Sequence, residues 1–179
     1  MQKYENICFI SSNSFRFAIY TIYKSMKIFK LKSELISYLY DIRGEKTLAL
    51  VPTMGSLHQG HTSLIKSAIL DCDIVICSIF VNPTQFNNPD DFDIYPKSIE
   101  DDIVILQNVN CDLLYCPNKF DVYSENEDVK YFDFNGLDTY MEGIGRKGHF
   151  DGVVTIVEKL FEIVLPNKAF FGEKDLQQL

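Results

Sequence analysis

Two of the three histidines in the chain, His58 and His61, are only three residues apart. They belong to the segment Pro-Thr-Met-Gly-Ser-Leu-His-Gln-Gly-His, which begins at Pro52. Gly55 permits a tight turn in this segment, and Gly60 lets the backbone approach a ligand closely. If a helix follows, its first N–H groups and both imidazoles can donate hydrogen bonds to phosphate oxygens. The spacing therefore predicts a phosphate site; a metal site is the alternative interpretation, although no third ligand is evident.

Neutral amide side chains follow the next apolar run of the sequence. Asn82 and Gln85 lie in a loop that Pro83 stiffens. Each amide offers both a donor and an acceptor, which suits a hydroxylated carboxylic acid as ligand. Ordinary turn chemistry is the alternative interpretation, because Asn and Pro are common turn residues.

Charged residues follow the last apolar run, where the sequence reads Gly-Glu-Lys-Asp from Gly172. Lys174 can neutralise phosphate charge in a pentavalent transition state, and Asp175 can receive ribose hydroxyls or hold Lys174 in place. A solvated helix face is the alternative interpretation of such a run. Asp101 and Asp102 open another expected helix, where acidic residues commonly complement the helix dipole.

These segments are connected by apolar runs that alternate with helical patterns. The runs predict strands over residues 28–31, 47–51, 73–81, 111–116 and 168–171, with 129–134 as a further candidate. Helical spacing predicts helices over residues 33–43, 60–70, from 98 onwards, and up to 164. The first of these helices should carry Leu35, Ile36, Leu39 and Tyr40 on one face.

Strands alternating with helices imply an α/β fold with a Rossmann-like, doubly wound parallel sheet that is covered on both faces. Sheets of this kind bind ligands at the carboxyl ends of their strands. The loops after Val51, Val81 and Phe171 are therefore predicted to form the site.

The composition is that of an ordinary globular domain. The 179 residues are 46% hydrophobic and 23% charged, enough for one domain with a sizeable core. A net charge of −8 argues against a nucleic-acid or anionic-membrane partner, and no run reaches the roughly 18 apolar residues of a membrane span. The five cysteines form no C-x-x-C pair and are expected as buried hydrophobes in a reducing compartment, which predicts a cytoplasmic protein.

The first 32 residues carry six basic side chains against a single acidic one, Glu5, and residues 1–25 are expected to be an extension. Two interpretations are open. The segment is either a weak targeting segment or the product of a mis-assigned start, since Met26 opens a stretch that reads as an ordinary first strand. The catalytic domain is expected to occupy residues 26–179.

The H-x-G-H tetrad of His58 to His61 resembles the motif of a nucleotidyltransferase superfamily that includes class I aminoacyl-tRNA synthetases. Further motifs, in the same order along the chain, resemble the pantothenate synthetases in particular. These motifs lie at residues 78–86, 91–96, 142–153 and 171–179. The resemblance runs from about Met26 to Leu179 and implies the Rossmann-like fold of that superfamily.

The resemblance implies an ATP-dependent ligase that joins pantoate to β-alanine. The pantoate carboxylate attacks the α-phosphorus of Mg-ATP, and the β-alanine amine then attacks the resulting adenylate and expels AMP. The residues implied in catalysis are His61, His58 and Lys174. The residues implied in ATP binding are Pro52, Thr53, Met54, Gly55, His58, Gly60, His61, Gly172, Glu173, Lys174 and Asp175. Pantoate is expected at Gln85, Asn82 and Gln178, Mg²⁺ is expected at Asp101 or Asp102, and the family implies a homodimer.

The family continues with a second nucleotide-contacting loop and a small carboxy-terminal domain. Because the sequence ends at Leu179, we expect an incomplete catalytic domain, no carboxy-terminal domain and an incomplete active site. One alternative is another nucleotidyltransferase of the superfamily, which would have no reason to carry Gln85 and Gln178 together. The other alternative is an inactive truncated fragment.

Overall fold

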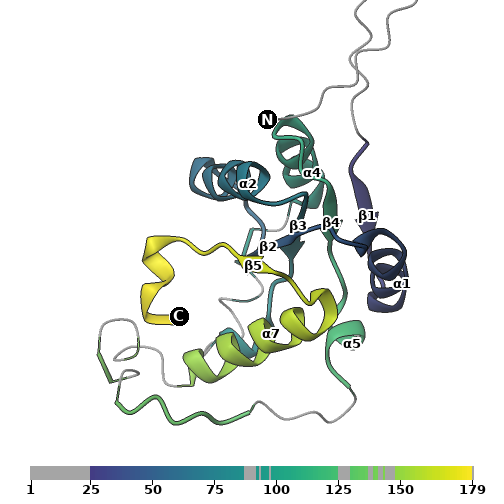
Figure 1. Ribbon diagram of the computed structural model, residues 1–179. Coiled ribbons are helices and arrows are strands. Elements are labelled where there is room, and N and C mark those ends of the chain that lie inside the picture. The colour runs from purple at the N-terminus through teal and green to yellow at the C-terminus, as the bar shows by residue number, and fades with distance from the viewer. Residues whose placement is uncertain are drawn as a thin grey trace, which may run out of the picture.

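The computed structural model describes residues 25–86, 92, 94–96, 98–124, 130–136, 139–140, 143 and 148–178. Both interpretations of the amino-terminal segment concern residues that, apart from Ser25, lie outside this described part. Within it, strands and helices alternate along the chain as the sequence predicts (Figure 1).

The centre of the fold is a parallel sheet with the strand order β1-β4-β3-β2-β5. Its strands are β1 (Lys27–Phe29), β2 (Leu48–Thr53), β3 (Ile74–Ile79), β4 (Leu113–Tyr115) and β5 (Lys168–Ala169). Strand β3 is buried along its whole length and β2 over its first four residues. Strands buried on both faces read as continuous apolar runs, which is why these two were readily predicted from the sequence.

Helices cover both faces of the sheet, which confirms the doubly wound α/β fold (Figure 1). One face carries α1 (Lys32–Arg43) and α7 (His149–Val164), and the other carries α2 (Gln59–Asp71) and α4 (Ile99–Asn108). The short helix α5 (Lys119–Val122) follows β4. Each layer has its own hydrophobic cluster, because neighbouring residues of β2 and β3 point to opposite faces of the sheet. No helix in this described part is long and apolar enough to cross a membrane.

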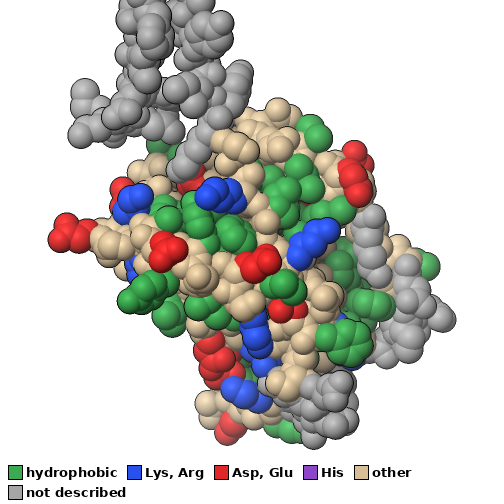
Figure 2. Space-filling view, turned by 90° about the vertical axis from the view of Figure 1, so that its right-hand side faces the viewer, with side chains coloured by type: hydrophobic (Ala, Val, Ile, Leu, Met, Phe, Trp, Pro, Cys, Tyr) green, Lys and Arg blue, Asp and Glu red, His purple; other side chains and the backbone are tan. Residues whose placement is uncertain are grey.

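Helix α1 buries only part of the apolar face that the sequence predicts. Leu35 and Leu39 are buried, but Ile36 is 46% exposed and Tyr40 is 85% exposed. Helical spacing fits two adjacent stripes, and only the packing against the sheet selects the one that is buried. Figure 2 views the molecule from the side of α1 and shows acidic, basic and hydrophobic side chains interspersed there.

The strand expected over residues 129–134 is not formed in its described part, residues 130–134. Phe132 instead donates its backbone N–H to the Asp151 carboxylate at 2.9 Å. The ring of Phe134 packs 6.0 Å, centroid to centroid, from the ring of Phe150. This segment therefore packs against the start of α7 and does not pair with the sheet. The last expected helix is also different, because residues Glu173–Gln178 form a 3-10 helix, η3.

The four described cysteines are free thiols: Cys72, Cys77, Cys111 and Cys116. Cys77 and Cys111 are buried in the sheet layer that packs against α2 and α4. Burial raises the pKa of the Cys111 thiol to about 12, so this thiol stays protonated and serves as a small apolar side chain.

Candidate active site

The chain reverses its direction across the sheet at β2. From β2 it winds through β3 to β4 on one side, whereas β5 returns to pair with the opposite edge of β2. Doubly wound sheets bind ligands at such a switch point, beyond the carboxyl ends of the strands. The loops that leave β2 and β5 carry His58 to His61 and Gly172 to Asp175, so the topology brings these two predicted segments together. Lys174 lies close enough to His61 to influence its pKa.

The backbone between β2 and α2 makes a tight turn. Gly55 has a φ of 85° and Ser56 a φ of 53°, both in the left-handed region. Thr53 Oγ1 accepts the N–H of Gly55 at 3.2 Å and donates to the carbonyl oxygen of Ser78 at 2.8 Å. The turn is thereby attached to the ends of two strands, and Gly55 adopts the conformation expected from the sequence.

Both histidines cap the start of helix α2. His58 is the N-cap residue, and its Nδ1 accepts the backbone N–H of Gly60 at 3.0 Å. His61 Nδ1 accepts the backbone N–H of His58 at 3.3 Å, and the two ring centroids are 4.1 Å apart. Capping patterns are usually sought with Ser, Thr, Asp or Asn, so the sequence did not predict this reciprocal cap.

The caps determine the tautomer of both imidazoles. A backbone N–H can only donate, so each Nδ1 must be an unprotonated acceptor. In the neutral form the proton therefore lies on Nε2 of both His58 and His61. Neither ring can take up a second proton without losing its bond to the backbone. Each imidazole consequently offers one N–H donor whose position is set by the helix start.

The surroundings of His61 favour its neutral form. Partial burial lowers the pKa of His61 below its ordinary value of 6.5, and His58 and Lys174 lower it further, while Asp102 and Asp175 act in the opposite direction. Near neutral pH, His61 therefore acts as an uncharged donor, and Lys174 supplies positive charge beside it.

Asn82 follows β3 and is fully buried. Its Nδ2 donates to the carbonyl oxygen of Gly152 at 3.0 Å. Its Oδ1 accepts from the backbone N–H and the hydroxyl of Thr84, at 3.3 and 3.0 Å, and from the Tyr123 hydroxyl at 2.9 Å. These four bonds engage both the oxygen and the NH₂ group of a fully buried amide, so the geometry favours holding the turn over direct contact with a substrate.

The turn continues into the 3-10 helix η1 (Pro83–Gln85), which packs against the start of α7. His149 is buried, and its Nδ1 lies 2.9 Å from the carbonyl oxygen of Gln85. A carbonyl only accepts, so Nδ1 of His149 carries the proton and donates. A Cβ on Gly152 would come within 2.5 Å of the Thr84 carbonyl oxygen, which leaves no room for a side chain. The sequence did not predict the hydrogen bond between His149 and the backbone of Gln85. Gly152, which allows the close contact with Thr84, was the only available indication that α7 packs against this turn.

The segment after β5 turns tightly. The N–H of Asp175 donates to the carbonyl oxygen of Gly172 at 2.8 Å. Lys174 and Asp175 form an ion pair at 2.6 Å, and the Lys174 side chain is mostly exposed. The ion pair is what the second expected role of Asp175, fixing Lys174, requires, and both expected roles stay predictions. The prediction for the Gln178 side chain lies outside the described side chains.

Asp101 and Asp102 open helix α4 in different surroundings. The Asp102 carboxylate is buried and accepts the backbone N–H groups of Ser56 at 2.9 Å and Leu57 at 2.7 Å. Asp101 is exposed and accepts a hydrogen bond from the Ser98 hydroxyl. Asp102 does not fit the expected Mg²⁺ site, because Mg²⁺ takes accessible carboxylate oxygens and keeps several waters. Among the described residues, no three His, Cys, Asp or Glu side chains cluster as a metal site would require.

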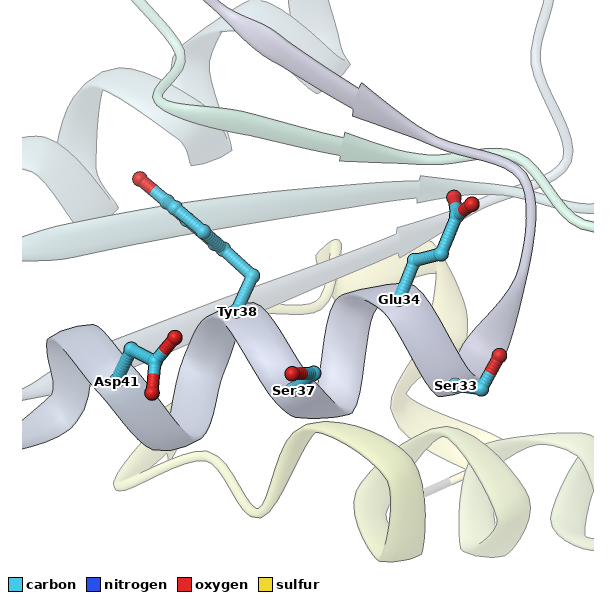
Figure 3. Close-up of a pocket in the computed structure, with 5 residues that line it drawn as sticks. All are labelled: Ser33, Glu34, Ser37, Tyr38 and Asp41. Carbon is cyan, nitrogen blue, oxygen red and sulfur yellow. The ribbon is translucent and has the colours of Figure 1, made fainter.

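The hollow drawn in Figure 3 is separate from these loops. Its lining residues all belong to α1: Ser33, Glu34, Ser37, Tyr38 and Asp41. None of the predicted site residues lines it. A second hollow lies at the carboxyl end of β3, where it borders the turn that carries Gln85; its lining includes Ile79, Val81, Pro83 and Lys119.

A parallel sheet with a histidine-capped helix at its switch point defines an α/β domain of the H-x-G-H nucleotidyltransferase type. A family model described as pantoate-beta-alanine ligase matches residues 27–179, and the chain belongs to this family.

Curated relatives agree with this assignment. The pantothenate synthetase of Flavobacterium psychrophilum is 49% identical over 156 residues, which are 86% of this chain and 55% of the relative. The pantoate–β-alanine ligase of Schizosaccharomyces pombe is 50% identical over 133 residues, which are 74% and 47% of the two chains. The chain thus spans about half the length of the curated relatives it matches.

Solved structures share the fold. The pantoate-beta-alanine ligase of Francisella tularensis, complexed with "Beta-gamma ATP and Beta-alanine", superimposes with a TM-score of 0.83 at 42% identity, over 86% of this chain and 59% of that one. The pantothenate synthetase of Thermus thermophilus gives a TM-score of 0.79 at 38% identity, over 86% and 54%.

Proposed function

We propose that the chain carries the nucleotide- and acid-binding part of an enzyme that condenses pantoate with β-alanine at the expense of ATP. The observation that carries this proposal is the pair of imidazole donors at the start of α2, located at the switch point of the sheet. A switch point and a helix N-terminus both favour a bound phosphate. The ATP and β-alanine named for the Francisella structure are consistent with this proposal.

The proposed reaction has two steps. A pantoate carboxylate oxygen attacks the α-phosphorus of ATP, which forms pantoyl adenylate and releases pyrophosphate. The β-alanine amine then attacks the adenylate carbonyl carbon, which forms the amide bond and releases AMP. Neither step requires a covalent enzyme intermediate, so the protein contributes orientation and charge stabilisation.

The described residues divide these tasks among three loops. His58 and His61 donate their Nε2–H groups to phosphate oxygens, and Lys174 offsets the negative charge that develops at the α-phosphate. Asp175 holds Lys174, and a contact with the ribose hydroxyls remains part of the proposal. Gln85 is proposed to bind pantoate together with Gln178. Asn82 holds the turn that carries Gln85, whose backbone N–H donates to the Asn82 carbonyl oxygen.

Mg²⁺ belongs to the proposal only as the ion that accompanies the ATP phosphates. Asp102 does not fit as its ligand, and the proposal assigns no step to the ion. A cytoplasmic location is supported by the free thiols, because reducing conditions keep cysteines unpaired. The homodimer expected from the family stays a prediction, which sedimentation equilibrium of the purified chain would test.

The proposed function is tested by pantoate-dependent exchange of labelled pyrophosphate into ATP. In a protein with the full length of the curated relatives, His61→Ala should lower the exchange rate by about 10²-fold, since it removes one donor aimed at the developing charge. Gln59→Ala is the matched control, because Gln59 lies between the two histidines and is exposed. Exchange that is independent of pantoate would favour another nucleotidyltransferase reaction. Equal exchange in the folded His61→Ala variant and the control would refute the assigned role of the histidine.

A further inference from the structure

The carboxylate of Asp102 is an unusual partner for the turn that is proposed to bind phosphate, because it and the phosphate would both be negative. It contacts the backbone of that turn. Only 3% of the residue is exposed. Its two oxygens accept from two consecutive backbone N–H groups, those of Ser56 and Leu57, at 2.9 and 2.7 Å. The bonds join residues 46 and 45 positions apart in the sequence, so the first turn of α4 contacts the turn after β2.

These two bonds select one conformation of the turn. A carboxylate can accept both N–H groups only if they point to the same side, and Ser56 meets this condition with a φ of 53°. The carboxylate also leaves no room for a side chain at Gly55, since a Cβ there would lie only 2.9 Å from Asp102 Oδ2. An amide at residue 102 would offer one acceptor oxygen and an NH₂ group, so one backbone N–H would face a donor.

The turn leads directly into the capping histidines. Leu57 is covalently joined to His58, whose Nδ1 caps α2 and whose backbone N–H is bonded to His61. A displacement of the Leu57 backbone therefore displaces both Nε2–H donors. We propose that Asp102 is a positioning residue that holds the two histidines through the turn backbone, and that it is not a metal ligand. This inference rests on the proposed nucleotide site.

Two substitutions separate this role from that of a metal ligand. Asp102→Asn keeps the size of the side chain but loses one acceptor, and Asp102→Glu keeps the charge but moves it by one methylene. A positioning role predicts that both variants bind AMP about tenfold more weakly or worse, in EDTA as well as in Mg²⁺. Glu100→Gln is the matched control, since Glu100 is an exposed carboxylate on the same helical turn.

The second measurement reads the turn itself, without any ligand. In ¹H–¹⁵N spectra, the Ser56 and Leu57 amides should shift and exchange faster with solvent in Asp102→Asn but not in Glu100→Gln. Thermal unfolding shows whether each variant is folded, and Asp102→Glu serves if Asp102→Asn does not fold. Unchanged amides together with unchanged AMP binding would overturn the inference, as would a loss of binding confined to Mg²⁺.

A wild-type chain that binds no AMP would refute the proposed nucleotide site instead. The amide measurement would then still decide whether Asp102 holds the turn, so the two failures are distinguishable.

Discussion

Removal of the Asn82 side chain tests whether this amide is a structural hub or a ligand group. Asn82→Ala deletes four hydrogen bonds at a fully buried position. The carbonyl oxygen of Gly152 and the hydroxyl of Tyr123 each lose an interior partner, which costs about 1–3 kcal/mol per group. Thr84 is half-buried, so water can replace the lost Asn82 oxygen as the hydrogen-bond partner of its N–H and hydroxyl groups.

The expected loss is therefore about 3 kcal/mol in the free energy of unfolding, from two interior groups at about 1.5 kcal/mol each. For a domain of this size, about 1 kcal/mol lowers the melting temperature by roughly 2–4 °C, so a decrease of about 6–12 °C is expected. Urea unfolding followed by circular dichroism gives the free energy of unfolding, and a temperature scan gives the melting temperature.

Asn118→Ala is the matched control. Asn118 also begins a short helix and also accepts a backbone N–H through Oδ1, from Asp121 at 3.0 Å, but it is exposed. Its loss should cost about 1 kcal/mol or less. If Asn82→Ala were no more destabilising than Asn118→Ala, the hub role would be refuted. A selective loss of pantoate affinity at unchanged stability would favour direct contact with the acid.

Three further predictions concern one or two residues each. His149→Ala should weaken pantoate binding about tenfold with little change for ATP, whereas His149→Asn should restore it, because Asn Nδ2 can replace the donor to Gln85; calorimetric titration with each ligand checks this. The pKa of His61 in the folded chain lies below 6.5, so the stability that neutral His61 contributes is complete above pH 6.5 and is lost as the pH falls towards the folded pKa. The free energy of unfolding should therefore decrease less below pH 6.5 in His61→Gln than in the wild-type chain. An identical dependence of the unfolding free energy on pH in both chains would contradict the lowered pKa. Iodoacetamide at about pH 8 should leave Cys77 and Cys111 unmodified in the native chain but alkylate both in urea, as peptide mass spectrometry would show, since burial raises both thiol pKa values.

The sequence alone predicts the strands that are buried by apolar neighbours on both faces of the sheet. Residues of β2 and β3 are apolar on both faces, so their runs identify them without knowledge of the rest of the fold. The aromatic residues at 131–134 have the same local preference, but Phe132 and Phe134 contact the start of α7 instead of the sheet. Pairing partners are a property of the whole chain, which a local pattern does not contain.

For the candidate site, the sequence singled out residues of which the structure brings several together, but it did not predict how each side chain is hydrogen-bonded. The pattern singled out His58 and His61, and the structure places the rings beside each other. That their Nδ1 atoms cap the helix depends on side-chain rotamers, which spacing alone does not determine. The different surroundings of Asp101 and Asp102 could not be predicted, because adjacent carboxylates at a helix start look alike in a sequence, and only the packing of α4 buries one of them.

Strand β5 determines when during folding the site can exist. It joins β2 late in the sequence: the Leu48 N–H donates to Asn167 Oδ1 across 119 residues, and Ala169 pairs with Leu50. Closing so long a loop is slow, because its conformational entropy is lost before the contacts form. The nascent chain can build β1 to β4 and their helices first, but the second side of the switch point is created only when β5 docks. Until β5 pairs with β2, the chain that precedes it therefore lacks one side of the proposed nucleotide site.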